Sequence, residues 1–184
     1  MKLIWAPWRM EYIKENTKRK GQSALGGLKA KDCFFCQALK GKPVKNYILY
    51  SNSNALVMLN RYPYNNGHLM VAPCRHVGEI EKLNPKESAA IFELVQQSVK
   101  VLKKVMRPDG FNIGANLGRY AGAGQPGHFH IHIVPRWVGD VNYMPLLTET
   151  KVVCEYLEQT YQRLKPLLEA ELRRASNNKK RCLK

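Results

Sequence analysis

Short apolar runs separated by turn residues dominate the middle of the chain. Three of them, YILY (47–50), NALVMLN (54–60) and GHLMVAP (67–73), are bounded by Asn, Gly and Pro, a pattern that predicts β-strands. The last two runs are joined through Asn66-Gly67, the dipeptide most typical of a hairpin turn. The pattern therefore predicts neighbouring antiparallel strands.

The next segment has helical periodicity. Asn84 can cap a helix, Pro85 suits the first helical position, and Glu87 stands where the acid of a capping box belongs. Apolar residues then recur with a period of 3.6 and form one stripe: Ile91, Leu94, Val95, Val99, Leu102, Val105 and Met106. Pro108-Asp109-Gly110 ends the pattern, so one long helix is predicted here.

The remaining pattern adds two strands and a terminal helix. GFNIGAN (110–116) and HIHIVPR (130–136) are predicted strands, separated by a glycine-rich loop. Residues 151–174 have a helical pattern, which Pro166 is expected to kink or break. We therefore expect an α+β domain with an antiparallel sheet, one long central helix and a C-terminal helix. We assign residues 1–150 to this domain with its N-terminal arm, and residues 151–184 to a helical extension with a basic tail.

Composition narrows the class of protein. The 184 residues, 45% of them apolar, suit one compact globular domain. The formal charge of +16 would attract the phosphates of nucleotides, nucleic acid or anionic lipid. The chain has no apolar run of eighteen residues, and its opening segment is too short for a signal peptide, so we expect a cytoplasmic protein with no membrane span. An odd count of five cysteines fits the same reducing compartment.

Three of the five histidines alternate along one predicted strand. In GHFHIHIVPRW (127–137), His128, His130 and His132 share one face, and the apolar residues between them point into the core. A lone strand histidine is usually structural, and metal binding or chance are simple alternatives. Three in register after an amide-rich loop instead form a row of imidazoles beside that loop, which indicates a site.

This stretch resembles the signature of the histidine-triad (HIT) family of nucleotide hydrolases and transferases. That signature, His-x-His-x-His followed by two apolar residues, is matched by residues 128–134. WAPWRMEYI (5–13), AGAGQPGH (121–128) and PRWVGDVNYMP (135–145) resemble in particular the dinucleoside polyphosphate phosphorylases and hydrolases of bacteria and archaea. The resemblance covers residues 1–150, and more weakly the terminal helix, and implies a HIT-like fold.

The resemblance implies nucleotidyl transfer on diadenosine tetraphosphate or a similar compound. His130 would attack the α-phosphate and carry a covalent nucleotidyl group, while His132 would hydrogen-bond phosphate oxygens. Inorganic phosphate would then release the nucleotide in a phosphorylase, and water in a hydrolase. A neutral imidazole is a competent nucleophile near pH 7, so the chemistry of the residues agrees.

Further contacts follow from the same resemblance. Asn60 matches an asparagine near the nucleotide sugar, and His68 matches a histidine beneath the active site, with a structural core role as the alternative. Asn116 and Gln125 flank the glycine loop as candidate phosphate or sugar contacts. Mg²⁺ on the polyphosphate is a further expected cofactor, and a homodimer is expected because family members commonly form one.

Several alternatives stay open from the sequence. Arg136 could grip phosphate or pair with Asp140, and Trp137 could stack on a base or pack at a dimer interface. A nucleoside phosphoramidase, or a nucleic-acid-directed deadenylating or binding protein, are alternative functions. Nucleic acid is the less favoured partner, because the chain has no accessory finger beyond one C-x-x-C and no RNA-binding aromatic signature.

The C-x-x-C of Cys33 and Cys36 is a weak metal signal by itself. A thioredoxin-like redox pair is disfavoured because the flanking βαβ pattern is missing. In metal-bearing members of the family, and in galactose-1-phosphate uridylyltransferases, the four corresponding positions bind zinc, so the resemblance adds His76 and His128. Such a zinc would be structural because four protein ligands leave no open position. Empty, reduced thiols are the alternative.

Overall fold

The computed structural model of the chain describes residues 30–43, 45–140 and 155–182. The predicted N-terminal arm and residues 151–154 of the predicted terminal helix lie outside these ranges. Among the described residues, no helix is both long and apolar enough to cross a membrane.

Five strands form one antiparallel sheet in the order β1-β2-β3-β5-β4. They are β1 (Ile48–Ser51), β2 (Ala55–Leu59), β3 (Leu69–Pro73), β4 (Gly110–Gly114) and β5 (Ile131–Arg136). All five were predicted, each within three residues of its observed ends. The antiparallel sheet and the α+β class are therefore confirmed.

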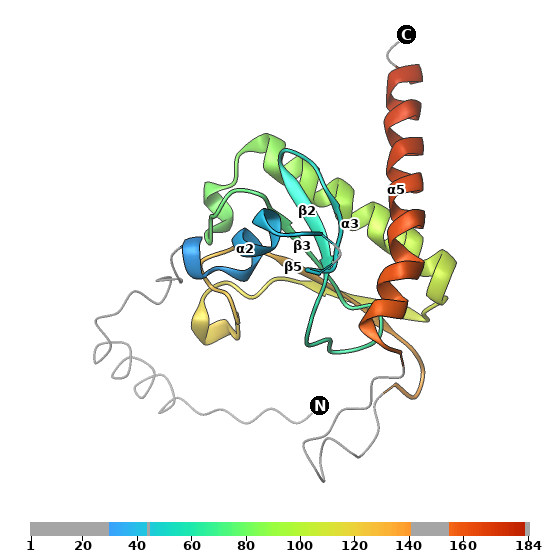
Figure 1. Cartoon of the computed structure of the whole chain (residues 1–184), viewed down its shortest axis with the longest axis horizontal. Helices are drawn as coiled ribbons and strands as arrows, with labels where there is room; N and C mark the ends of the chain where they lie inside the picture. Colours follow the sequence, from blue (N-terminus) through green and yellow to red (C-terminus); the bar gives the residue numbers. More distant parts are fainter. Residues whose placement is uncertain (1–29, 44, 141–154, 183–184) are drawn as a thin grey trace, which may run out of the picture.

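Helices cover both faces of this sheet. α3 (Pro85–Met106) and α5 (Leu157–Cys182) pack on one face, and the short α2 (Phe34–Lys40) lies on the other (Figure 1). Three short 3-10 helices complete the described structure: η1 (Ala30–Asp32), η2 (Ile80–Lys82) and η3 (Arg119–Ala121). Figure 1 also shows the C-terminal part of α5 extending beyond the rest of the fold.

The two-residue period of the strands separates the two faces. Val57 of β2 belongs to the main core with α3 and α5, whereas its neighbour Met58 belongs to the smaller core under α2. In β5, Ile133 is fully buried in the main core, so His132 points toward the α2 side. The triad therefore lies on the face opposite the long helices, as the alternation predicts. β5 begins at Ile131, so His128 and His130 precede the strand itself.

Two glycines permit close approaches between segments of the fold. Gly67 adopts φ +71° in the turn before β3, where an added Cβ would lie 2.5 Å from Met106 Sδ. The predicted Asn66-Gly67 turn is present, but it closes the nine-residue connection 60–68 rather than a tight hairpin. At Gly78 a Cβ would lie 2.5 Å from the Pro126 carbonyl oxygen, so the segment after β3 can lie directly against the loop before the triad.

α5 differs from its prediction. It begins at Leu157, continues through Pro166 without a break, and ends at Cys182 rather than near residue 174. Pro166 lies on the exposed side, while four residues spaced three or four apart are buried in the main core: Tyr161, Leu164, Leu168 and Leu172. Burial of this stripe stabilises the helix enough to tolerate one missing backbone donor.

α2 was not predicted from the sequence. Its apolar residues Phe35, Ala38 and Leu39 do have helical spacing, and Gly41 follows the last turn. A seven-residue helix is marginal by propensity alone. Burial of Phe35 and Ala38 against the sheet supplies the missing stabilisation.

α3 begins where predicted, and its capping box is linked to β3 by an ion pair. The Asn84 side chain accepts from the Glu87 backbone amide, and the Glu87 carboxylate accepts from the Asn84 amide, both at 2.9 Å. Arg75, just after β3, donates to both Glu87 carboxylate oxygens at 2.8 and 2.9 Å. The Arg75 hydrogen bond lowers the pKa of Glu87 below its ordinary 4.5.

Because of this ion pair, we expect the free energy of unfolding to decrease at acid pH. Because the folded pKa of Glu87 is the lower one, its contribution is present above about pH 4.5 and disappears as the pH falls through the folded value. Between pH 6 and pH 3, wild type should lose about 1 kcal/mol more unfolding free energy than Glu87→Gln, a modest value because Arg75 is half exposed. Urea unfolding at each pH measures this. Glu81→Gln, which removes an exposed carboxylate, is the control; parallel curves for wild type and Glu87→Gln would contradict the prediction.

Candidate functional site

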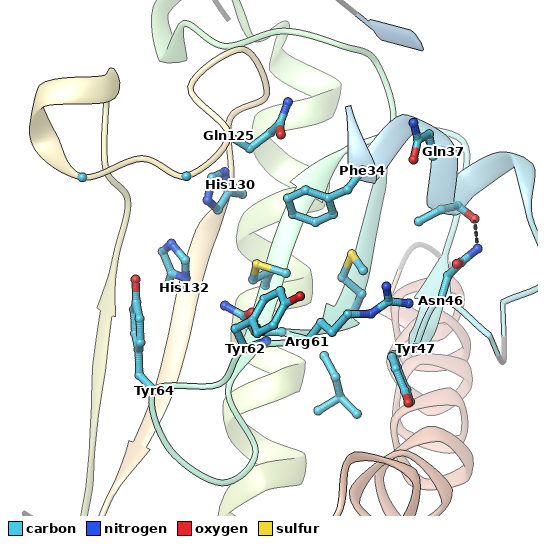
Figure 2. Close-up of a pocket in the computed structure, with 17 residues that line it drawn as sticks. Phe34, Gln37, Asn46, Tyr47, Arg61, Tyr62, Tyr64, Gln125, His130 and His132 are labelled. Carbon is cyan, nitrogen blue, oxygen red and sulfur yellow. Dashed lines mark hydrogen bonds between the residues drawn. The ribbon is translucent and has the colours of Figure 1, made fainter. Parts of the chain in front are cut away.

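A cavity of about 460 Å³ lies on the α2 side of the sheet. Figure 2 shows His130, His132 and Tyr64 on one side of it and Gln37, Asn46 and Tyr47 on the other. Arg61 and Tyr62 lie between these two groups (Figure 2), and the lining also includes five apolar residues: Phe34, Ala38, Met58, Leu59 and Met70. A mostly apolar cavity of this size with polar groups at its ends is typical of a small-molecule site.

His130 is held in one tautomer. Its Nδ1 lies 2.8 Å from the backbone carbonyl oxygen of His128, and a carbonyl can only accept, so Nδ1 carries a proton. Burial lowers the pKa of His130, which keeps the ring neutral near pH 7. The lone pair is therefore on Nε2, and the ring lines the cavity. This is the arrangement a nucleophilic imidazole needs.

His132 is oriented through His68. The Tyr64 backbone N–H lies 3.0 Å from His68 Nδ1, and an amide can only donate, so that nitrogen is unprotonated. His68 must then carry its proton on Nε2 and donate it to His132 Nδ1 at 2.9 Å. Burial, and next the neighbouring His130, hold the pKa of His132 down to about 4. The neutral His132 therefore has its proton on Nε2 and acts as a hydrogen-bond donor at the cavity.

The other predicted nucleotide contacts lie in different places. Asn60 and Gln125 line the cavity, whereas His68 lies behind His132 and is fully buried. Gln125 is 4% exposed, and its Nε2 is buried with no hydrogen-bond partner within the described residues. Asn116 is not among the lining residues. It donates to the Gly122 carbonyl oxygen at 3.3 Å and so supports the glycine loop.

The structure bears on the open alternatives for Arg136 and Trp137. Arg136 donates from Nε and Nη2 to the two carboxylate oxygens of Asp140 at 2.7 and 2.8 Å, so it forms the ion pair rather than facing the cavity. Trp137 donates its backbone N–H to the same carboxylate and does not line the cavity.

The first triad histidine belongs to a cluster of four potential metal ligands: Cys33, Cys36, His76 and His128. Their ligand atoms all lie within 4.8 Å of one another, and the closest pairs are 3.3 Å (Cys33 Sγ to His128 Nδ1) and 3.4 Å (Cys36 Sγ to His76 Nδ1). Ligands of a tetrahedral zinc, at its usual S and N distances, are separated by roughly 3.3 to 3.8 Å. The four residues could therefore hold one metal ion.

The protonation of these residues also fits a metal. His128 donates from Nε2 to the Pro73 carbonyl oxygen at 2.8 Å, which leaves the Nδ1 lone pair facing the thiols. Burial holds the pKa of His128 down to about 4, so the ring stays neutral. Burial, and next the neighbouring Cys33, raise the pKa of Cys36 to about 11. A divalent cation would compensate the buried thiolates that are otherwise disfavoured.

α2 connects the cluster of two cysteines and two histidines to the cavity. Cys33 precedes this helix and Cys36 lies within it, while Phe34 and Gln37 of the same helix line the cavity. The ring of Phe35 lies 4.8 Å from that of His128 and 5.1 Å from that of His130. Neither Phe34 nor Gln37 was predicted to line a site. Phe34 lies inside the C-x-x-C segment and Gln37 directly follows it, which was the available signal.

Comparison with known proteins gives the same family over most of the chain. Residues 42–138 match the profile of the HIT domain. The chain is 37% identical over 158 residues to AP-4-A phosphorylase of Mycobacterium tuberculosis, covering 85% of this chain and 79% of that protein. It is 34% identical over 98 residues to the asymmetrical bis(5'-nucleosyl)-tetraphosphatase of Schizosaccharomyces pombe, covering 53% of each.

A solved structure supports the fold as well. A Zn-bound histidine triad family protein from Mycobacterium smegmatis has a TM-score of 0.62 and 25% sequence identity, covering 80% of this chain and 99% of that one. The HIT profile spans more than half of the chain and includes all three triad histidines, whose side chains the fold gathers behind and beside one cavity. The chain therefore belongs to the histidine-triad family.

Proposed function

We propose that this chain is a diadenosine tetraphosphate phosphorylase that works through a nucleotidyl group on His130. The observation that carries the proposal is the neutral His130 ring, with Nδ1 on a carbonyl and Nε2 at the cavity. The 37% identity to AP-4-A phosphorylase over 85% of this chain supports phosphate as the second acceptor. The tetraphosphatase of Schizosaccharomyces pombe matches a shorter part of the chain.

The cavity suggests how the substrate lies. The apolar part of the lining, which includes Phe34, Met58 and Met70, suits an adenine ring. Asn60 at the end of β2 is then within the same cavity for the ribose, and the α-phosphate reaches His130 and His132. Gln125 offers its unpartnered amide to the phosphate oxygens.

In the first step, His130 Nε2 forms a bond to the α-phosphorus and the bond from that phosphorus to the bridging oxygen breaks. ATP leaves with the bridging oxygen, and the adenylyl group stays on His130. The ring then carries a positive charge. The His128 carbonyl oxygen stabilises this charge by accepting a hydrogen bond from Nδ1–H. His132 Nε2–H donates to a non-bridging oxygen, where negative charge gathers in the transition state.

In the second step, a phosphate oxygen forms a bond to the same phosphorus and the bond to His130 breaks. ADP leaves, and His130 regains its neutral form. Two in-line displacements at one phosphorus retain its configuration overall. The same residues serve both steps, because the acceptor enters along the path by which ATP departs.

Zinc is proposed at the cluster of Cys33, Cys36, His76 and His128, where it would supply the positive charge that stabilises buried thiolates. Cys33 and Cys36 would fasten α2, while His128 would position the backbone carbonyl that holds His130. Nothing in the described residues supports the expected Mg²⁺ site, since the cavity lining contains no carboxylate.

Product analysis tests the proposed function. With diadenosine tetraphosphate and inorganic phosphate we expect ADP and ATP in equal amounts, and without phosphate no more than one cleavage per chain. Anion-exchange chromatography of the nucleotides measures this, with heat-inactivated protein as the control. AMP plus ATP at the same rate without phosphate would make the chain a hydrolase. Cleavage of adenosine phosphoramidate alone would make it a phosphoramidase, and sequence-selective, salt-resistant oligonucleotide binding would favour the nucleic-acid alternative.

A further inference from the structure

Asp140 lies outside the cavity and is held firmly at the end of β5. Its two carboxylate oxygens accept from Arg136 Nε at 2.7 Å and Nη2 at 2.8 Å, and one also accepts from the Trp137 backbone amide at 3.1 Å. The Asp140 side chain is 8% exposed. A bidentate Arg–carboxylate pair has a defined geometry, so Asp140 is a fixed acceptor at this position.

That fixed acceptor holds the connection between β2 and β3. Asn65, in the middle of this connection, donates from Nδ2 to Asp140 Oδ2 at 2.7 Å and to the Pro135 carbonyl oxygen at 3.1 Å. Both acceptors belong to the end of β5 and the turn after it. The connection is therefore fastened to the same strand that carries His132.

The fastened connection continues to the triad. The Asn65 carbonyl accepts from the His68 backbone amide at 3.2 Å, and the preceding residue, Tyr64, donates its amide to His68 Nδ1 at 3.0 Å. His68 Nε2 then lies 2.9 Å from His132 Nδ1. A series of hydrogen bonds therefore connects the carboxylate of Asp140 to the ring of His132, through Asn65, its neighbour Tyr64, and His68.

We propose that Asp140 is a positioning residue for His132: by holding Asn65, it keeps the Tyr64 amide on His68, so that His132 presents Nε2–H to the α-phosphate. The proposal rests on the function proposed for His132. The two neutral tautomers of an imidazole differ little in energy, so a single hydrogen bond can decide which one is present. Loss of the Asp140 contact would let the connection shift and His68 donate from either nitrogen.

The alternative is a purely structural role, in which Asp140 only neutralises Arg136. Asn65→Ala separates the two roles because it leaves the Arg136–Asp140 pair intact and removes the hydrogen bonds from Asn65 to Asp140 and to the Pro135 carbonyl. Asn112→Ala is the matched control. Asn112 Oδ1 accepts from Arg136 Nη1 at 2.7 Å, so this variant disturbs the same guanidinium without touching Asn65.

Steady-state kinetics, and ring ¹⁵N NMR of the substrate-free protein, test the proposal. We expect Asp140→Ala and Asn65→Ala each to lower kcat about tenfold with KM changed less than about twofold, since the lost interaction is one made in the transition state. The double variant should have the kcat of Asn65→Ala, because that variant already removes the contact through which Asp140 is proposed to act on His132. In both single variants the His132 Nδ1 signal should lose the pattern of a purely Nε2-protonated ring, while Asn112→Ala keeps it.

Unchanged kcat in Asn65→Ala, or His132 signals equal to those of Asn112→Ala, would overturn the proposal. If Asp140→Ala does not fold, Asp140→Asn retains one acceptor for Asn65 and should lie between wild type and Asn65→Ala. The NMR comparison needs no substrate. A protein that cleaves no dinucleoside polyphosphate but shows the expected tautomer change would refute the proposed function while leaving the positioning link in place.

Discussion

Replacing His130 by Ala should lower phosphorolysis by at least about 10⁴-fold, because it removes the proposed nucleophile that forms the covalent bond to phosphorus. The His130 ring is buried, so its removal should also cost about 1 to 2 kcal/mol of unfolding free energy, too little to unfold the domain. Circular dichroism and a thermal melt would show that the fold remains. The loss of activity would then belong to the chemistry.

Labelling locates the bond. Wild type mixed with substrate labelled at the α-phosphorus, without inorganic phosphate, should hold the label on His130 in a form that is stable in base and lost in acid. His132→Ala is the matched control, since His132 is expected to donate a hydrogen bond and not to attack. That variant should still become labelled, at a rate about 10²- to 10³-fold lower.

Two results would refute the assignment of the nucleophile. One is activity of His130→Ala within tenfold of wild type. The other is label on a different side chain in the wild-type protein, identified by mass spectrometry after alkaline proteolysis.

Removing the proposed zinc should have the second-largest effect, which we expect on thermal stability and on nucleotide affinity. If one zinc is bound with a free concentration near a thousand times its dissociation constant, its loss costs about 4 kcal/mol, which lowers the melting temperature by roughly 10 °C for a chain of this size. The Cys36→Ser variant should show the same loss without chelator. Nucleotide affinity should fall as well, by roughly tenfold, because α2 carries both metal ligands and cavity-lining residues.

Cys74→Ser is the control for this experiment. Cys74 is half buried and burial raises the pKa of its thiol, but it is not part of the cluster. It should keep one zinc per chain and wild-type AMP affinity, measured by elemental analysis and isothermal titration calorimetry. A Cys36→Ser protein that still contains one zinc, or that binds AMP as wild type does, would contradict the proposed coupling.

Local patterns were enough to predict most elements of this fold. The capping box of Asn84 and Glu87 and the apolar stripe of α3 depend on contacts between residues close in sequence, so they could be predicted without knowing the fold. The alternation around the triad likewise assigned His132 to one face and Ile133 to the other. Pro166 misled the prediction, because the burial of distant side chains, and not local propensity, keeps α5 continuous.

The sequence by itself determined the type of chemistry: a row of imidazoles on one face of a strand, two thiols three residues apart, and a domain that can enclose them. Only the tertiary structure decided which nitrogen of His128 and of His132 carries the proton, since groups far along the chain, the Pro73 carbonyl and the His68 ring, select these tautomers. It also decided that Arg136 faces Asp140 rather than phosphate, and that α2 lies between metal cluster and cavity. The physical reason is that hydrogen bonds and burial depend on neighbours in space, and a linear pattern reports only neighbours along the chain.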